Sequence, residues 1–116
     1  DWWSMGVTLY EILFKKRPFR GKSSREIAQK IASGTLQFPS AARELSRECL
    51  DFIARLLQKD PKDRLGVGEI GLQRLKAHPW MRSIDWKLVG SKQLVPPFQP
   101  SQDRANFNAI FEAEDV

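Results

Sequence analysis

The sequence has few of the residues from which metal centres and nucleophilic active sites are built. It contains one cysteine, Cys49, and one histidine, His78. Ordinary zinc sites need several Cys, His or carboxylate ligands in spacings such as CxxC or HExxH, and neither spacing occurs. A single cysteine forms no disulfide within the chain, and a lone histidine before a proline at a helix end is typically structural. We therefore expect no metal site and no catalytic triad.

Long apolar runs and phosphate-binding patterns are missing as well. No run approaches the roughly 20 apolar residues of a membrane-spanning helix, and no signal-like apolar stretch stands at the start. The glycines at 66, 68 and 71 form neither a GxGxxG nor a Walker pattern, and no GxSxG elbow presents a serine. We therefore expect an intracellular, cytoplasmic protein without a transmembrane segment, and no active site within this stretch.

What is present is the composition of a folded domain with an uneven charge. Hydrophobic residues make up 41% of the 116 residues and charged residues 28%. Residues 1–100 hold 18 Lys and Arg against 10 Asp and Glu, whereas residues 101–116 hold one Arg against four acids. Six cations gather within eleven residues, namely Lys15, Lys16, Arg17, Arg20, Lys22 and Arg25. This basic cluster is either a solvated loop or a surface that attracts an acidic partner. Nucleic acid is not expected as that partner, because no stacking aromatics alternate with the cations.

Apolar periodicity and helix-capping residues predict helices in the first part of the chain. Residues 2–14 are apolar on nearly every side and predict a helix for the centre of a domain, ended by Pro18. A short amphipathic helix is expected at about 24–33, because Ser23 and Glu26 have the spacing of a capping box.

The remainder alternates between breakers and further helices. Residues 35–45 show no period and predict a loop, and a third helix is expected at about 46–58. A fourth helix is expected to end near His78, and a short helical turn is expected at 85–89. From residue 90 onward, prolines with polar neighbours predict an extended segment whose aromatic residues anchor it on another surface.

Several short motifs occur in an order that is specific in combination. They include DWWSMGV at residues 1–7, LLxxDPxxR at 56–64 and HPW at 78–80. In this order they resemble the C-terminal half of a eukaryotic protein kinase, and the resemblance covers essentially the whole chain. The double Trp and the PFxP of residues 97–100 narrow the resemblance to the AGC group of serine/threonine kinases. The end of the chain, residues 106–114, is similar to the YANK branch of that group.

The resemblance implies an all-α fold in two parts. Residues 1–90 correspond to the helical C-lobe portion of the kinase fold, helices F to I, and residues 91–116 to the extended AGC C-terminal tail. The Gly-rich loop, the strand lysine and the two aspartates of phosphoryl transfer are expected upstream of residue 1. ATP and Mg²⁺ are then cofactors of the intact kinase, and none is expected for this segment alone. The implied partners are protein substrates and the missing N-lobe in the same chain.

Four positions match residues that have roles in the family. Asp1 matches an aspartate that supports the active site by accepting hydrogen bonds from the catalytic-loop backbone; the alternative is a simple helix cap. Arg64 matches an arginine that supports the active site by pairing with the glutamate closing the activation segment; the alternative is a surface arginine. Glu11 matches an acid that binds an arginine of the peptide substrate, and a solvated role is equally open. Phe107 matches the tail aromatic that contacts the nucleotide pocket, although the acids and tyrosine that follow it in the group are absent.

The basic cluster at 15–25 lies on the loop that approaches the peptide in such folds. We therefore hypothesise that it favours substrates with acidic flanking residues. No residue of the chain is expected to be catalytic or to bind a metal.

Two classes of function remain open. In the first, the chain is part of an ATP-dependent serine/threonine kinase, supplies its substrate-side scaffold and regulatory tail, and is inactive alone. In the second, it is a noncatalytic, pseudokinase-like docking or scaffold module. The sequence upstream of residue 1 distinguishes them, because only the first requires the catalytic and metal-binding aspartates there.

Overall fold

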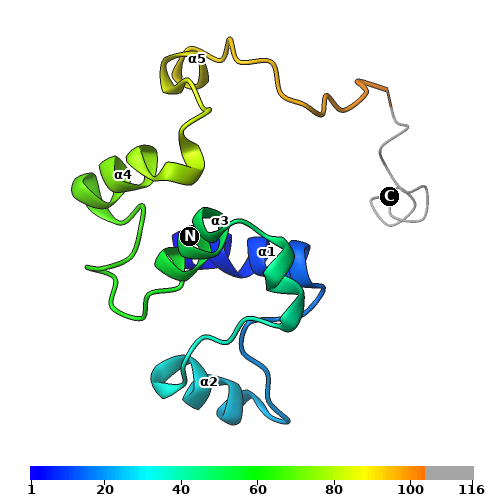
Figure 1. Ribbon diagram of the computed structural model, residues 1–116, viewed down its shortest axis with the longest axis vertical. Helices are drawn as coiled ribbons and strands as arrows, with labels where there is room; N and C mark the ends of the chain where they lie inside the picture. The colour runs from blue at the N-terminus through cyan, green and yellow to red at the C-terminus, as the bar shows by residue number, and fades with distance from the viewer. Residues whose placement is uncertain (104–116) are drawn as a thin grey trace, which may run out of the picture. The chain divides into compact units, whose positions relative to one another are not determined.

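The computed structural model describes residues 1–103, and these residues form helices and irregular segments without a strand (Figure 1). The elements are α1 (Trp2–Phe14), α2 (Ser24–Ser33), the 3₁₀ helix η1 (Ser40–Glu44), α3 (Arg47–Leu56), α4 (Gly68–Ala77), the 3₁₀ helix η2 (Pro79–Met81) and α5 (Trp86–Gly90). The all-α expectation is confirmed. The chain divides into two compact units, Asp1–Ile84 and a second that begins at Asp85, while the proposed domain boundary at 90/91 stays a prediction. Within residues 1–103 no helix has both the length and the apolar character needed to cross a membrane.

The helix predicted at residues 2–14 is confirmed, but Pro18 is not what ends it. Lys15 adopts a left-handed conformation with φ 57° and ψ 25°, and its backbone N–H donates to the Glu11 carbonyl at 2.8 Å. This closes the last turn three residues before the proline. The sequence gives little sign of it, because a left-handed C-terminal residue is usually Gly or Asn rather than Lys.

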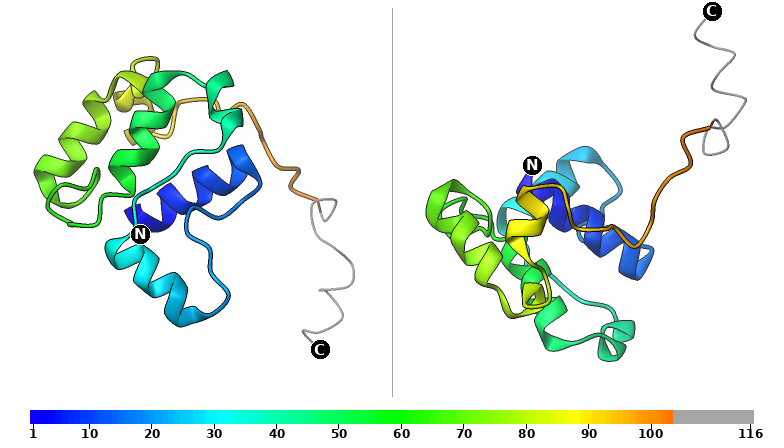
Figure 2. Two further views of the ribbon diagram at one scale, coloured as in Figure 1. Left: turned by 60° about the horizontal axis from the view of Figure 1, so that its bottom comes forward. Right: turned by 90° about the horizontal axis from the view of Figure 1, so that it is seen from above.

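Within the first unit α1 is buried along one stripe, and the expectation that this helix lies at the centre of a domain stays a prediction for the intact protein. Gly6, Tyr10 and Phe14 are buried at intervals of four residues. Met5 and Ile12 face away, and Ile12 is 58% exposed. The reason is geometric, because α3 packs along α1 and covers a single face of it (Figure 2).

The close approach of α1 and α3 depends on the glycine at position 6. A Cβ atom built at Gly6 would lie 2.9 Å from both Leu56 Cβ and Leu57 Cδ2. Ile53 and Leu56 on α3 are the largest fully buried side chains of the described residues. The core cluster around this contact comprises Tyr10, Phe14, Ala42, Cys49, Ile53 and Leu57. The backbones can therefore come together here because no side chain separates them.

Two helices begin with side-chain caps, and the sequence predicted the one at Ser23. Ser23 Oγ accepts from the Glu26 N–H at 3.2 Å, and Ser46 Oγ accepts from the Cys49 N–H at 3.1 Å. The Glu26 carboxylate accepts from the Lys22 N–H at 2.8 Å, one residue earlier than in a standard capping box. α2 starts as predicted, yet none of its residues is buried.

The segment expected to be a loop between α2 and α3 contains η1. Pro39 stands at its N-cap with φ −70°, and Ala42 within it joins the core. Nearby, Tyr10 Oη donates to the Gln37 carbonyl at 2.6 Å and ties this segment to α1. Ala42 packs into the core, a tertiary contact that local periodicity does not reveal.

The second unit begins with the short helix predicted near residue 85. Asp85 caps α5 by accepting from the N–H groups of Lys87 and Leu88 at 3.0 and 3.3 Å. Residues 91–103 follow without helix or strand. Phe98 is 71% exposed there, so its proposed role as an anchor on another surface stays a prediction.

Candidate functional site

Asp1 stands at the start of α1, next to a tightly packed loop. It occupies the N-cap position, and its carbonyl accepts from the Met5 N–H at 2.9 Å. Its exposed side chain makes no capping hydrogen bond, so the alternative of a side-chain helix cap is not realised. The next residue, Trp2, covers Gly66, where a Cβ would lie 2.3 Å from the indole ring and where φ is +86°. Only glycine fits position 66. The Asp1 carboxylate, which makes no capping hydrogen bond, remains available to accept hydrogen bonds.

Arg64 is held in one orientation by three contacts. Its Nε donates to the Gln58 carbonyl at 2.9 Å, and its Nη2 donates to the Lys59 carbonyl at 3.1 Å. The guanidinium also lies 5.2 Å from the centre of the Trp3 ring, which stacks on Phe19 at 5.9 Å. Within residues 1–103 no carboxylate pairs with it. Arg64 is thus a half-buried, preoriented cation rather than a freely solvated one.

Glu11 lies near the C-terminal end of α1, beside the basic cluster. Its Oε1 lies 3.6 Å from Arg17 Nε, and the two side chains are 44% and 73% exposed. An exposed pair of this kind contributes little stability. A hollow of about 330 Å³ is lined by Glu11 together with Lys15, Lys16 and Arg17. The structure therefore brings Glu11 together with the first half of the basic cluster, as their closeness in sequence suggests.

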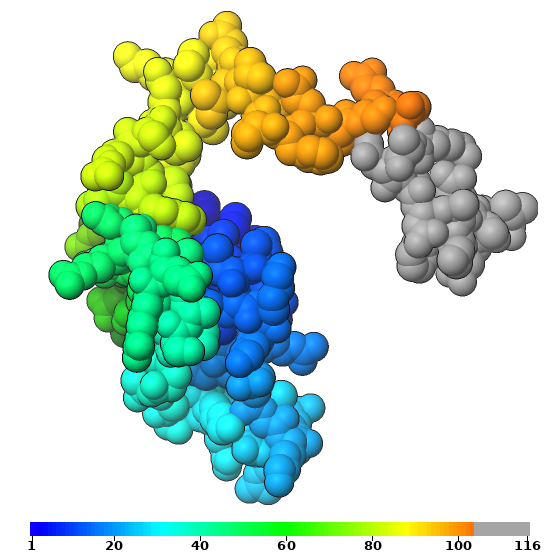
Figure 3. Space-filling view, turned by 45° about the vertical axis from the view of Figure 1, so that its right-hand side comes forward, coloured from blue at the N-terminus to red at the C-terminus, as the bar shows by residue number. Residues whose placement is uncertain are grey.

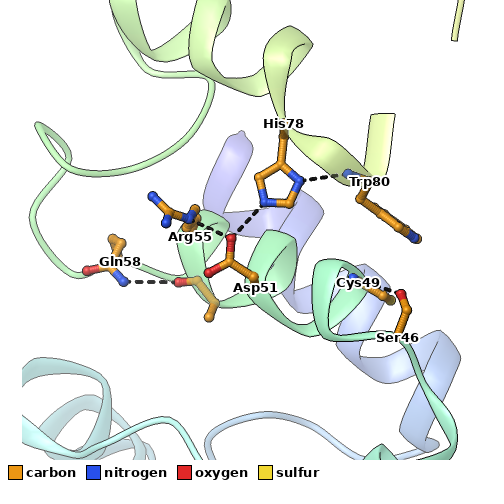
Figure 4. A network of polar contacts seen from close by, with 8 residues as sticks. Ser46, Cys49, Asp51, Arg55, Gln58, His78 and Trp80 are labelled. Carbon is orange, nitrogen blue, oxygen red and sulfur yellow. Dashed lines mark hydrogen bonds and ion pairs between the residues drawn. The ribbon is translucent and has the colours of Figure 1, made fainter. Parts of the chain in front are cut away.

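A buried histidine joins α3 to η2 in a network that the sequence did not reveal (Figure 4). His78 is 6% exposed, and its Nδ1 accepts from the Trp80 N–H at 3.1 Å. Its Nε2 therefore carries the proton and donates to Asp51 Oδ2 at 2.8 Å. Arg55 Nε donates to the same oxygen at 2.7 Å.

The hydrogen bonds among His78, Asp51 and Arg55 indicate a structural role for the histidine. The hydrogen bond from His78, followed by that from Arg55, lowers the pKa of Asp51 below its ordinary value. The histidine is thus satisfied on both ring nitrogens, as expected for a structural residue. The i,i+4 spacing of Asp51 and Arg55 was the available signal, but the histidine lies 27 residues further along the chain.

The remaining site predictions are spread over the chain or lie beyond what the structure describes. Asp1 and Glu11 stand at opposite ends of α1, and Arg64 lies in the loop between α3 and α4. Phe107 lies outside the described residues. Within residues 1–103 no group of three or more His, Cys, Asp or Glu side chains is arranged to hold a metal ion.

Comparisons with known proteins identify the family of this chain. The model of the protein kinase domain matches residues 1–81. Serine/threonine-protein kinase N2 of Danio rerio is 35% identical over 118 residues, which cover 98% of this chain and 12% of that protein. Serine/threonine-protein kinase gad8 of Schizosaccharomyces pombe is 38% identical over 118 residues, covering 98% of this chain and 20% of that protein.

A human relative gives the same result. Protein kinase C delta type of Homo sapiens is 36% identical over 115 residues, which cover 96% of this chain and 16% of that protein. The chain spans a fifth or less of the length of each of these three relatives. Because the family model matches well over half of the chain, the chain belongs to the protein kinase family.

Proposed function

We propose that this chain is the substrate-side portion of the C-lobe, with the tail, of an AGC-group serine/threonine kinase of the YANK type. The intact protein transfers the γ-phosphoryl group of ATP to Ser or Thr hydroxyls of protein substrates inside the cell, in the cytoplasm. The relatives named as serine/threonine-protein kinases support the reaction class. The single observation that carries the proposal is the preoriented guanidinium of Arg64, which lacks a carboxylate partner within residues 1–103.

Arg64 is the positioning residue for the activation segment in this proposal. Two carbonyls and the Trp3 ring fix the plane of the guanidinium and engage Nε and Nη2. The N–H groups that remain can donate to a glutamate carboxylate supplied from elsewhere in the intact protein. Such a planar, charge-assisted contact is worth about 1.5–3 kcal/mol, and a lysine ammonium reproduces its geometry poorly.

Asp1 supplies the second support in this proposal. Its carboxylate makes no bond to its own helix and can accept backbone N–H groups of the catalytic loop. Phosphoryl transfer depends mainly on positioning and on electrostatic stabilisation, so a scaffold that fixes these loops contributes directly to rate. ATP and Mg²⁺ supply the transferred group and neutralise its charge when bound. No metal-binding acidic cluster lies within residues 1–103, so their ligands are proposed to come from the rest of the intact protein.

The exposed face of α1 fits the same proposal. Met5, Ile12 and Leu13 are large apolar side chains that other elements of residues 1–103 leave exposed. In the intact kinase we propose that the rest of the C-lobe covers them, while the N-lobe and the tail complete the nucleotide site. Phe107 is the proposed tail contact with the nucleotide.

The experiment measures phosphoryl transfer to a generic Ser/Thr peptide by the intact protein and by its Arg64→Lys variant. The matched control is Arg43→Lys, which changes an exposed arginine of η1. We expect Arg64→Lys to lower kcat by about 10- to 100-fold, because it loses the bidentate contact. Arg43→Lys should leave kcat unchanged. The thermal midpoints of both variants separate a loss of positioning from a loss of folding.

Two outcomes contradict the proposal. If the folded intact protein transfers no phosphoryl group but binds proteins, the noncatalytic docking module takes its place. If the intact protein is active and Arg64→Lys is as active as Arg43→Lys, Arg64 does not position the activation segment.

A further inference from the structure

The segment between α1 and α2 carries a positive charge that its neighbours do not neutralise. The two acids beside it are already engaged, because Glu11 pairs with Arg17 and Glu26 pairs with Lys30 at 3.3 Å. Within residues 1–103, no carboxylate pairs with the side chain of Lys15, Lys16, Arg20, Lys22 or Arg25. The stretch after α1, drawn in blue, lies at the surface of the molecule (Figure 3). In an open loop, solvent would screen this charge, but these cations also surround a hollow.

A hollow of about 380 Å³ lies between these cations, and we call it the basic hollow. Its lining residues are Lys15, Lys16, Arg17, Phe19, Arg20, Gly21 and Ile27. Four of the seven are cationic, while Phe19 is buried and Ile27 half-buried. The neighbouring hollow that contains Glu11 shares Lys15, Lys16 and Arg17 with it. The cations therefore form the common wall of two depressions, one of which contains no carboxylate in its lining.

We propose that the basic hollow binds an acidic segment of a protein substrate, so that the kinase selects Asp or Glu beside the phosphorylated residue. This inference rests on the proposed kinase function. Glu11 Oε1 lies 3.6 Å from Arg17 Nε, so a substrate arginine would compete with Arg17 for this carboxylate. A substrate carboxylate instead meets cations that have no partner, so the local field favours acids.

The same surface suits a peptide better than a nucleic acid. The aromatic ring of the hollow, Phe19, is 8% exposed and stacked on Trp3, so no base can stack on it. The Glu11 carboxylate also interrupts the positive surface where a continuous phosphate backbone would pass. A short acidic segment, in contrast, needs only two or three cations and an apolar floor.

The experiment uses the intact protein and two double variants of equal charge. Lys16→Ala with Arg20→Ala removes two cations of the basic hollow, whereas Lys22→Ala with Arg25→Ala removes two that do not line it. Each protein phosphorylates two peptides that differ only in flanking Glu or Gln residues. We expect the wild type and the control to prefer the Glu peptide, and the hollow variant to lose about three- to tenfold of that preference, mainly in KM. The preference should also weaken as salt is raised.

A binding assay keeps this inference separate from the proposed function. Fluorescence anisotropy measures the affinity of each protein for a labelled Glu-rich peptide, whether or not phosphoryl transfer occurs. If no peptide is phosphorylated but the hollow variant alone binds weakly, the kinase function fails and the acidic docking site stands. If the wild type does not distinguish Glu from Gln, or both double variants lose the preference equally, the inference is overturned. Equal competition by single-stranded DNA of the same charge also overturns it.

Discussion

Replacing Gly6 by alanine tests the packing of α1 on α3. The added Cβ would lie 2.9 Å from Leu56 Cβ, which is fixed to the backbone and cannot rotate away. The substitution gains about 1 kcal/mol of helix propensity, because glycine is a poor helix residue. Overpacking a tight contact typically costs about 1–3 kcal/mol. Since the clash involves a Cβ at a fully buried position, we expect the cost to exceed the gain.

The expected result is a net loss of up to about 2 kcal/mol in the free energy of unfolding of the intact protein, because the gain offsets only part of the cost. Denaturant titration followed by tryptophan fluorescence measures it, because Trp2 and Trp3 lie on the same helix. Gly90→Ala is the control, since no atom lies within 4 Å of the Cβ position there and α5 should tolerate the change. A Gly6→Ala variant as stable as wild type, or more stable, would refute the close approach of the two helices.

Four further predictions concern single residues, three through a side-chain contact and one through a backbone angle. Asp51→Ala should cost about 1–3 kcal/mol of stability, because it leaves the buried N–H of His78 unpaired. Asp51→Asn retains an acceptor for this N–H and should cost less. Equal losses of stability for the two variants in thermal unfolding would contradict this. The folded-state pKa of Asp51 is lowered. The ionised carboxylate therefore stabilises the fold fully above its ordinary pKa of about 4, and this contribution is lost as pH falls through the folded-state pKa. The stability of the Asp51→Asn variant should therefore depend less on acid than that of the wild type. Lys15→Gly should stabilise α1 by about 1 kcal/mol, because glycine adopts φ 57° without strain; a lower thermal midpoint would contradict it. Arg17→Ala should uncover Glu11 and lower the KM of the intact kinase for an Arg-containing peptide relative to its Gln analogue, and an unchanged ratio would show that the pair does not block that acid.

Local rules predicted most helices because the determining residues are neighbours in sequence. Ser23 and Ser46 cap α2 and α3 through hydrogen bonds that span three residues, and such contacts can be read from spacing. The last residue of α1 was predicted correctly, but its closure by a left-handed Lys15 was not, because this residue type disfavours that conformation. η1 escaped prediction because residues 35–45 show no apolar period, although Ala42 joins the core.

In the candidate site, too, contacts between neighbours in sequence could be predicted and contacts between distant residues could not. The closeness of Glu11 to the basic cluster follows from one helix turn and a short loop. The contact between His78 and Asp51 joins residues 27 positions apart, which periodicity cannot pair. The position of Arg64 came from resemblance to the family, whereas the two carbonyls that orient it are known only from the folded loop.

Phosphoryl transfer by the intact protein is tested most directly with [γ-³²P]ATP, the purified protein and a Ser/Thr peptide. We expect label on the hydroxyl of Ser or Thr, with a rate that falls at least about tenfold when Arg64 becomes Lys. A folded intact protein that incorporates no label at any peptide concentration would show that it is not a kinase.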